Sequence, residues 1–393
     1  MDQEKPDSDS DAASSSDSGS LVGSITAEEL RQWLDTDEPT LLDIRNRDEV
    51  EAWRIEGADR TEIPYMRFLS ASVTNSVEEL AADIDQPVVV VCPRGEESAS
   101  VVEMLHQVGI EAVNLTGGMH SWAQLYEGFT LDTEPVLIQY DRPSSGCLSY
   151  LLVSDGEAAV IDPLRAFVDR YRADAAEHGG TLVSAIDTHL HADHISGLSL
   201  LAEQSESVEP IVSTKTAMRG VERVSTVDAG EPITVGTTSI EPIAAPGHTS
   251  GMTALYVADL DLLLTGDGLF IEHVPRPDLE ADAADVRDAA RTLYRTLTDR
   301  FARFDDETRI VPGHYDPSNT ERPHIARLGD VRDLSVFDMT EAAFVDSVLN
   351  DMPPRPNNYE RIIDINCGTE VAEDEAFELE LGPNNCAAGS TSN

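Results

Sequence analysis

A dense group of metal-binding side chains follows one apolar segment, residues 182–186: His189, His191, Asp193 and His194. On an extended chain, the side chains of residues two apart project to the same side. A turn after them can bring the side chains of Asp193 and His194 to the same place. Imidazole and carboxylate groups are the usual protein ligands of zinc and of non-haem iron. The spacing therefore predicts a metal site at the end of a strand.

Three further candidates for the same site lie downstream: His248, Asp267 and His314. Each follows an apolar, strand-like run and has a glycine beside it, as expected for a ligand on a tight turn. The remaining histidines lack such a context, and we interpret them as structural or surface residues: His106, His120, His178, His273 and His324.

A different chemistry is indicated at Cys92, which directly follows the buried-strand signal of residues 88–91. Its loop, which contains Arg94, Gly95 and Ser98, leads into a predicted helix, whose amino-terminal N–H groups and dipole favour an anion. Such an environment can lower the pKa of a thiol and produce a nucleophilic thiolate. The alternative interpretation is a buried structural cysteine. The four cysteines show no paired spacing, which argues against a disulfide framework and against a cysteine-ligated zinc site.

The elements that must position these residues fall into two groups. Strand and helix signals alternate over residues 21–130, which predicts a parallel sheet covered on both faces. A second series of strand-like runs covers residues 135–375. Residues 1–20 and 376–393 are acidic, and we expect a disordered tail and a flexible tail there.

The composition restricts the partners of the chain. Its 393 residues carry a formal net charge of −47, and the acidic residues are spread along the whole sequence. We interpret this as adaptation to high salt, where ions screen carboxylate repulsion, rather than as an acidic partner-binding surface. Nucleic acid is excluded as a partner, because its phosphates would meet a strongly negative field. No apolar run suggests a membrane segment or a signal peptide, so we expect a cytoplasmic location.

Four segments within residues 21–130 resemble rhodanese signatures, and they occur in the same order as in rhodaneses. They are residues 41–45, 55–58, the C-x-x-G-x-x-S loop at 92–98, and 115–122. The resemblance implies that Cys92 accepts a sulfane sulfur and carries it as a persulfide within the loop amides. Arg94, Gly95 and Ser98 would then contact the substrate. Glu96 and Glu97 would repel an anionic donor, so the sulfur donor stays open.

The seven metal-binding candidates within residues 135–375 resemble, in type and order, the metal ligands of the metallo-β-lactamase superfamily. That resemblance implies a four-layer αββα fold. Further segments are similar to the persulfide dioxygenase branch: residues 149–152, 161–163, 265–270, 276–278, 353–356 and 363–366. In that branch one ferrous ion is held by residues matching His189, His248 and Asp267. His191, Asp193, His194 and His314 would then surround the site, and Arg276 matches a position that helps hold the thiol cosubstrate.

The resemblance implies that dioxygen oxidises a low-molecular-weight thiol persulfide to sulfite and thiol, while Cys92 supplies or removes sulfur. The thiol carrier, the direction of transfer and a homo-oligomeric state are left open. One alternative is a glyoxalase II-like thioester hydrolase with two zinc ions. There Asp193, His194 and His314 would hold the second ion and Asp267 would bridge both. The other alternative is a non-catalytic sulfur carrier or sensor.

Overall fold

The structure is a computed structural model that describes residues 23–36, 39–280, 285–316 and 318–388. It contains two compact units. The first comprises Met1–Arg45 and Asp59–Gly118, and the second comprises Asn46–Ala58 and Met119–Asn393. The tail expected at residues 1–20 lies outside the described residues. Among the helices that are described, none has the length and apolar character needed to cross a membrane.

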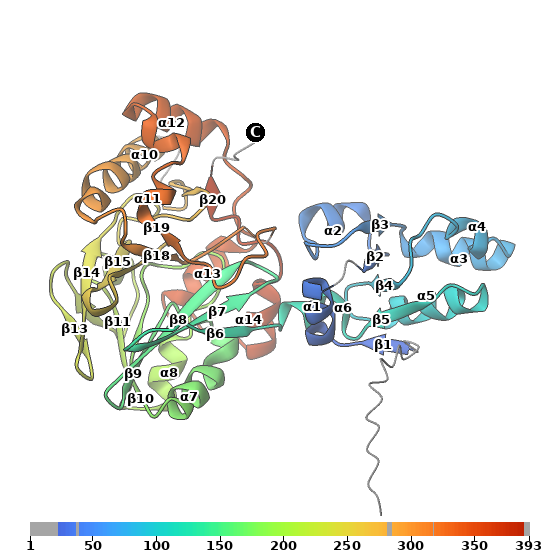
Figure 1. The fold of residues 1–393 in the computed structure, drawn as a ribbon, viewed down its shortest axis with the longest axis horizontal. Helices are drawn as coiled ribbons and strands as arrows, with labels where there is room; N and C mark the ends of the chain where they lie inside the picture. Colours follow the sequence, from blue (N-terminus) through green and yellow to red (C-terminus); the bar gives the residue numbers. More distant parts are fainter. Residues whose placement is uncertain (1–22, 37–38, 281–284, 317, 389–393) are drawn as a thin grey trace, which may run out of the picture. The chain divides into compact units, whose positions relative to one another are not determined.

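The first unit is built on a five-stranded parallel sheet, in the order β1-β5-β4-β2-β3 (Figure 1). Its strands are β1 (Gly23–Ile25), β2 (Thr40–Asp43), β3 (Arg60–Glu62), β4 (Val88–Val91) and β5 (Ala112–Leu115). The valine run forms β4, the central strand, and all four valines are buried. A continuous run of valines is typical of a parallel strand that is covered on both faces.

Helices pack on this sheet along their apolar sides. The helices of the first unit are α1 (Ala27–Thr36), α3 (Tyr65–Thr74), α4 (Val77–Leu80) and α5 (Glu96–Gln107). Phe68 of α3, Val77 of α4 and Val101 of α5 share one core cluster with Val88 and Val90. Alternate residues of β4 thus point to the face that α3, α4 and α5 cover, as the two-residue period of a strand requires.

The second unit contains two large sheets and one small one (Figure 1). The seven-stranded sheet has the order β12-β11-β10-β9-β8-β7-β6, the six-stranded sheet has the order β13-β14-β15-β16-β18-β19, and β17 pairs with β20. The strands are β6 (Glu127–Thr130), β7 (Val136–Arg142), β8 (Cys147–Ser154), β9 (Glu157–Ile161), β10 (Thr181–Ile186), β11 (Glu209–Ser213), β12 (Ser225–Val227), β13 (Ile233–Val235), β14 (Thr238–Ala244), β15 (Thr253–Val257), β16 (Leu262–Gly266), β17 (Val274–Pro275), β18 (Arg309–Pro312), β19 (Ala326–Arg327) and β20 (Ala387–Ala388).

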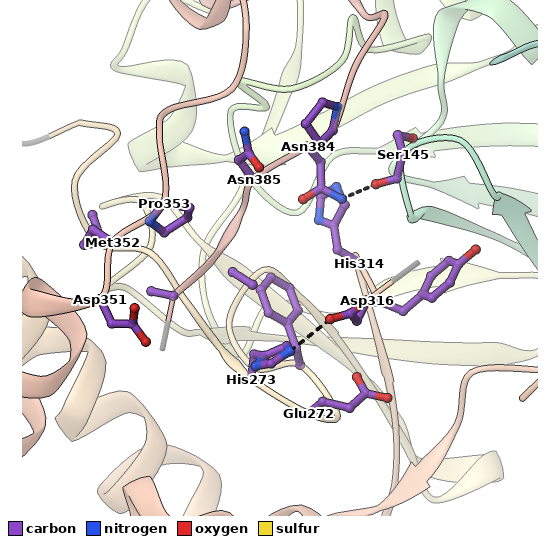
Figure 2. Close-up of a pocket in the computed structure, with 15 residues that line it drawn as sticks. Ser145, Glu272, His273, His314, Asp316, Asp351, Met352, Pro353, Asn384 and Asn385 are labelled. Carbon is purple, nitrogen blue, oxygen red and sulfur yellow. Dashed lines mark hydrogen bonds and ion pairs between the residues drawn. The ribbon is translucent and has the colours of Figure 1, made fainter. Parts of the chain in front are cut away.

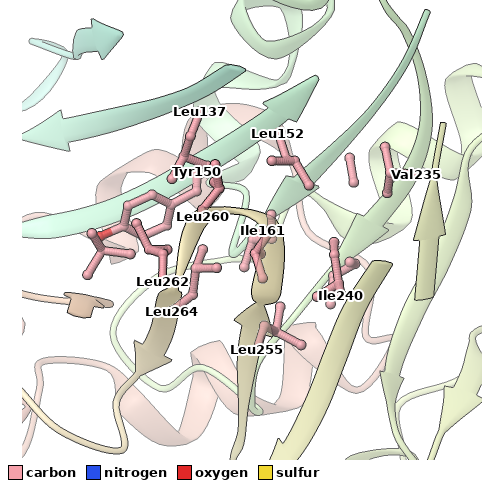
Figure 3. Close-up of a cluster of buried hydrophobic side chains, with 14 of the residues drawn as sticks. Leu137, Tyr150, Leu152, Ile161, Val235, Ile240, Leu255, Leu260, Leu262 and Leu264 are labelled. Atoms are coloured by element: carbon pink, nitrogen blue, oxygen red, sulfur yellow. The ribbon is translucent and has the colours of Figure 1, made fainter. Parts of the chain in front are cut away.

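The two large sheets pack face to face through a shared apolar core, part of which is shown in Figure 3. Leu152 and Ile161 contribute to it from the first of these sheets, and Leu255 and Leu264 contribute from the second. On β9 the neighbouring residue Val160 belongs instead to the cluster beneath the outer helices, so the strand alternates between two apolar environments. Both faces of the strand are therefore buried.

Helices cover the outer faces of the two sheets. On the first, α7 (Val168–Glu177) and α8 (Leu198–Gln204) join the outer cluster, and on the second, α10 (Val286–Arg295) and α12 (Glu341–Asn350) do so. The remaining helices are α2 (Arg47–Ala52), α6 (Gly118–Ala123), α9 (Thr214–Ala217), α11 (Leu328–Val331), α13 (Tyr359–Asn366) and α14 (Glu373–Leu379). Short 3₁₀ turns and one π turn occur at η1 (Arg165–Phe167), η2 (Ala258–Leu260), η3 (Thr296–Arg300), η4 (Phe301–Arg303) and η5 (Ser335–Asp338). This αββα arrangement, after a parallel-sheet first unit, confirms the predicted fold class.

The structure differs from the expected organisation at the junction of the units. Strand β6, which was expected to end the first domain, pairs antiparallel with β7 over its four residues. Residues 46–58 also group with the second unit. The backbone N–H and C=O groups of β6 are satisfied by β7, a pairing between strands that local sequence does not reveal.

The carboxyl-terminal segment also differs from the expectation of a flexible tail at residues 376–393. Residues 373–379 form α14, and Ala387–Ala388 form β20, which pairs with β17. Between them, Glu380 is buried and forms a 2.8 Å ion pair with the buried Arg142. The acidic composition suggested exposure, but a buried counter-charge and backbone pairing hold residues 376–388 in place. Residues 389–393 lie outside the described residues.

Candidate functional site

The H-x-H-x-D-H loop follows β10 at its carboxyl end, where β9 and β11 run parallel to it. Asp162, at the end of β9, fixes the start of this loop, because its carboxylate accepts hydrogen bonds from the Thr188 N–H at 2.7 Å and from Thr188 Oγ1 at 2.9 Å. Farther along, the Asn366 side chain of α13 donates to the carbonyls of His191 and His194, at 3.0 Å each. No local sequence pattern indicates these anchoring roles, because the partners are distant along the chain.

The structure brings together the three residues predicted to bind iron. One ligand atom from each of His189, His248 and Asp267 lies within 4.8 Å of the others. His248 follows β14 and Asp267 follows β16. The Nε2 atoms of His189 and His248 lie 3.7 Å and 3.5 Å from Asp267 Oδ2, and all three side chains are buried. Two imidazoles and one carboxylate that converge in this way match the donor set of a non-haem iron site.

Hydrogen bonds on the far side of each imidazole orient these donors. His248 Nδ1 lies 2.8 Å from the Arg276 carbonyl oxygen, which can only accept, so this nitrogen carries the proton. His189 Nδ1 lies 2.9 Å from Thr188 Oγ1, whose own proton goes to Asp162. Both arrangements leave the Nε2 lone pair directed at the cluster, which is the usual tautomer of a metal-bound histidine.

Buried polar atoms without a hydrogen-bond partner among the described residues occur in this cluster, at Nε2 of His189 and Oδ2 of Asp267, and beside it, at Nε2 of His194 and Oδ1 of Asp193. Such atoms are rare in native proteins, because an unpaired buried polar group costs free energy. A cation between His189, His248 and Asp267 would satisfy Nε2 of His189 and Oδ2 of Asp267. The side chains present therefore fit a metal ion.

The protonation states are consistent with metal binding. Burial lowers the pKa of His189 and of His248, so both are neutral near pH 7. Burial by itself would raise the pKa of Asp267, but the charge of His314 and its hydrogen bond outweigh burial and hold the pKa below its usual range. Neutral imidazoles and an ionised carboxylate are the forms that bind a cation.

The surrounding residues form a second cluster, in which one ligand atom from each of Cys147, Asp193, His194 and His314 lies within 4.8 Å of the others. His314 lies between two carboxylates, with Nδ1 2.6 Å from Asp267 and Nε2 2.9 Å from Asp193. Although burial lowers the pKa of His314, these carboxylates raise it well above its usual value. In the described structure each ring nitrogen of His314 thus faces a carboxylate oxygen.

Two cysteines that the sequence analysis left without a role lie at this site. Cys147 Sγ is 3.2 Å from Asp193 Oδ2. Cys386 lies in the segment expected to be a flexible tail. One ligand atom from each of Cys386, Asp267 and His314 lies within 4.8 Å of the others. Neither cysteine has a local motif, and only the fold brings them to the metal ligands.

Arg276, which the resemblance linked to the thiol cosubstrate, is buried and fully engaged. Its guanidinium donates to Asp278 through Nε and Nη2, and to backbone carbonyls of Pro353, Pro354 and Asn385. These five contacts use all five N–H donors of the guanidinium. In this structure Arg276 therefore ties three segments together, and its role toward a substrate stays a prediction.

The Cys92 loop lies in the first unit, between β4 and α5. Cys92 is buried, and its Sγ accepts a hydrogen bond from the Gly95 N–H at 3.0 Å and lies 3.1 Å from Ser98 Oγ. Gly95 and Ser98, two of the predicted contact residues, thus approach the sulfur, whereas Arg94 is exposed. Gly118 is needed beneath the loop, because a Cβ there would lie 2.1 Å from the Cys92 carbonyl oxygen.

Comparisons with known proteins agree with this geometry. Residues 26–125 match the rhodanese-like domain, and residues 143–314 match the metallo-beta-lactamase superfamily. The human mitochondrial persulfide dioxygenase ETHE1 is 30% identical over 183 residues, which cover 46% of this chain and 68% of the human protein. The chain belongs to the persulfide dioxygenase family. Its relatives thus imply an enzyme of the metallo-β-lactamase superfamily with a metal cofactor and a small-molecule substrate.

Two further comparisons distinguish the match to persulfide dioxygenases from the match to thioester hydrolases. The crystal structure of ETHE1 from Myxococcus xanthus superposes with a TM-score of 0.50 at 25% identity, covering 61% of this chain and 98% of that one. The hydroxyacylglutathione hydrolase of Brucella ovis is 34% identical, but over only 123 residues, which are 47% of its length. The match to the persulfide dioxygenases therefore extends over more of the relative than the match to the thioester hydrolase does.

Proposed function

We propose that this chain is an Fe(II)-dependent persulfide dioxygenase coupled to a rhodanese-type sulfurtransferase domain. The reaction consumes a low-molecular-weight thiol persulfide according to R–S–SH + O₂ + H₂O → R–SH + SO₃²⁻ + 2 H⁺. His189, His248 and Asp267 would hold one ferrous ion, which supplies the open coordination positions and the redox chemistry that dioxygen requires. Family membership supports the reaction, and the geometry of the three donors supports the ligand set.

One observation carries the choice of a single metal ion: the position of His314 between the carboxylates of Asp193 and Asp267. In a one-metal site both ring nitrogens would stay hydrogen-bonded to these carboxylates. His314 orients Asp267 through Oδ1 and leaves Oδ2 for the first ion. This is the behaviour of a residue that positions a metal ligand.

The protein side chains would also control access and protons. His189, His248 and Asp267 are each no more than 1% exposed, so the reacting sulfur would meet little bulk water there. The Arg276 carbonyl keeps the proton of His248 on Nδ1, which fixes the Nε2 lone pair as a donor. The chain thereby holds the protein ligands in one geometry before the substrate arrives.

A thioester hydrolase with two zinc ions is the second candidate. It is favoured by the orphaned Asp193 Oδ1 and His194 Nε2 atoms and by the Cys147 thiol beside them, which could all serve a second ion. In that case His314 would lose a proton on metal binding, because a coordinating imidazole must present a lone pair.

Metal content decides between the two. Anaerobically purified wild type and His194→Ala are compared by elemental analysis, with His178→Ala at an exposed position as the control. We expect one iron per chain in all three proteins and oxygen uptake with a supplied persulfide. Two zinc ions in the wild type and one in His194→Ala, without oxygen uptake, would establish the hydrolase instead.

For the first domain, we assign to Cys92 the transfer of a sulfane sulfur. The thiolate attacks the outer sulfur of a donor R–S–SH, a new S–S bond forms on Cys92, and the donor leaves as its thiolate. The Gly95 N–H and the Ser98 hydroxyl lie where they can stabilise the negative charge on sulfur. Sulfur transfer at Cys92 would be coupled to persulfide oxidation in one of two directions, either by making the small persulfide or by passing sulfur to sulfite.

A further inference from the structure

Ser98 lies between two partners in the first unit, and its single proton can serve only one of them. Its Oγ is 3.1 Å from Cys92 Sγ and 2.6 Å from Asn114 Oδ1. A hydroxyl group has one O–H to donate, and an amide oxygen can only accept. In this structure the proton of Ser98 therefore goes to Asn114, and only lone pairs of Ser98 face the sulfur.

The fold fixes the positions of these three side chains. Asn114 belongs to β5 and pairs with Val90 of β4, two residues before Cys92. Ser98 lies in the first turn of α5, which packs on β4 and β5. The side chain of Ser98 is fully buried, and Cys92 and Asn114 are 1% and 8% exposed. Water thus has little access to the Ser98 hydroxyl, and its hydrogen bonds are made within the protein.

Sulfur transfer changes the hydrogen bonding that the Cys92 sulfur requires. While Cys92 is a thiolate, the negative charge lies on Sγ, and a charge-assisted hydrogen bond is about twice as strong as a neutral one. Once Cys92 carries sulfur, the charge lies on the outer sulfur and Sγ is a weak acceptor. In either direction of transfer, Cys92 is a thiolate twice, as nucleophile when sulfur arrives and as leaving group when sulfur departs. A donor at Sγ is therefore needed in one state and not in the other.

An asparagine side chain can serve both states. It ends in an oxygen acceptor and an NH₂ donor of nearly equal shape, and a half-turn about the last side-chain bond exchanges them. With its NH₂ group toward Ser98, Asn114 would donate to Oγ, and the Ser98 proton could point at Sγ. Each donor in the chain from Asn114 through Ser98 to the Cys92 thiolate would then have an acceptor, and linked hydrogen bonds of this kind strengthen one another.

We propose that Asn114 is a positioning residue for sulfur transfer at Cys92, and that it acts by setting the direction of the Ser98 hydroxyl. The amide oxygen of Asn114 holds the Ser98 proton while Cys92 is a thiol or carries sulfur. Its NH₂ group releases that proton to Sγ while Cys92 is a thiolate. This inference rests on the proposed function, because it requires that Cys92 transfers sulfur.

A mutant cycle tests whether Asn114 acts through Ser98. Sulfur transfer from a small persulfide to cyanide is measured without dioxygen, so that the second unit does not consume the donor. Ser98→Ala removes a hydrogen bond to a charged group and should lower kcat/KM by about tenfold, whereas Asn114→Leu, which keeps the shape of the side chain, should lower it by about fivefold. In the double variant the loss should stay at about tenfold, because residues that act through one another are not additive. Losses that multiply would overturn the proposal.

Nuclear magnetic resonance gives a readout that a purely structural role would not change. Protein that is isotopically labelled at asparagine is titrated with base in the absence of a sulfur donor, and the side-chain signals of Asn114 are assigned through the backbone of β5. We expect these signals to follow the ionisation of Cys92, which is monitored by the ultraviolet absorbance of the thiolate. The change should be absent in Cys92→Ser and reduced in Ser98→Ala. Signals that are the same in the wild type and in Cys92→Ser would overturn the proposal.

An asparagine of the second unit is the internal control. Asn384 lies in the wall of a cavity of about 360 Å³ beside His314, and its side chain donates to the Ser145 carbonyl oxygen (Figure 2). A backbone carbonyl does not ionise. The side-chain signals of Asn384 should therefore be the same in the wild type and in Cys92→Ser at every pH, and a difference there would show that the substitution at Cys92 acts on the whole protein and not through Ser98.

Failure of this inference can be told apart from failure of the proposed function. If the wild type transfers no sulfur, the sulfurtransferase assignment fails, but the resonance experiment still decides the inference because it needs no donor. If transfer is active and the Asn114 signals do not follow Cys92, only the inference fails. Melting temperatures show whether each variant is folded, and the comparison of the wild type with Cys92→Ser requires no substitution of Asn114.

Discussion

The buried ion pair between Glu380 and Arg142 offers a sharp test of the carboxyl-terminal packing. Glu380 Oε2 lies 2.8 Å from Arg142 Nη1, and Oε1 accepts from the Ile195 N–H at 2.8 Å. Both side chains are 1% exposed. Ile195 directly follows the H-x-H-x-D-H motif, so Glu380 joins the end of the chain to the loop of predicted metal ligands.

The substitution Glu380→Gln removes the carboxylate charge but keeps the shape and one hydrogen-bond acceptor. The Arg142 guanidinium would then be a buried charge without its counter-charge, and breaking a buried pair in this way costs about 3–5 kcal/mol. Because Gln can still accept from Ile195, we expect the lower end, about 3 kcal/mol. A melting temperature changes by roughly 2–4 °C per kcal/mol in a domain of about 150–250 residues, which gives a decrease of about 6–12 °C.

Thermal unfolding followed by circular dichroism at molar salt measures the effect. Glu378→Gln, at a position whose side chain is 44% exposed, is the control and should change stability by less than about 0.5 kcal/mol. The double variant Arg142→Met/Glu380→Leu should be more stable than Glu380→Leu, because it leaves no unpaired buried charge. If Glu380→Gln unfolds at the same temperature as Glu378→Gln, the segment is not held as described.

Three further outcomes follow from the charge, the Cys92 loop and the ion pair between Arg276 and Asp278. With a net charge of −47, the melting temperature should fall as salt is lowered from molar to millimolar, and a constant value would refute salt adaptation. Cys92→Ser and Gly118→Ala should each abolish sulfur transfer and leave oxygen uptake with a supplied persulfide intact, and loss of that uptake would refute two independent sites. Burial raises the pKa of Asp278, but hydrogen bonds from Arg276 and Arg355 outweigh it and keep the pKa low. The ion pair therefore stabilises the fold above the ordinary carboxyl pKa, and this stability is lost as the pH falls. In Asp278→Asn the free energy of unfolding should depend less on pH in the acid range, and an unchanged pH dependence would contradict this.

Much of the fold could be predicted because local signals and tertiary environment agree. The four valines of β4 form the central strand of the first unit, where a strand buried on both faces needs apolar residues throughout. Val168, Tyr171 and Ala175 recur at helical spacing, and they form the buried side of α7. The junction near β6 could not be predicted, because its four residues are assigned by pairing with β7 rather than by their own pattern.

The carboxyl-terminal segment shows how composition can mislead. Acidic residues are usually exposed, so a flexible tail was the natural expectation for residues 376–393. Glu380 is buried because Arg142, 238 positions earlier in the chain, supplies the opposite charge. Cys386 is brought to Asp267 and His314 through the same packing. No pattern within the segment encodes either contact.

The sequence by itself determined the two-part fold class and the family, because strand periodicity and closely spaced motifs are local properties of the chain. It also predicted His189, His248 and Asp267 as one ligand set, and their convergence within 4.8 Å matches that prediction. Only the tertiary structure decided what surrounds them: His314 between two carboxylates, Arg276 with every donor engaged, and a cavity beside His314. These features depend on distances between residues far apart in the chain, which are set by the packing of two sheets and not by spacing along the sequence.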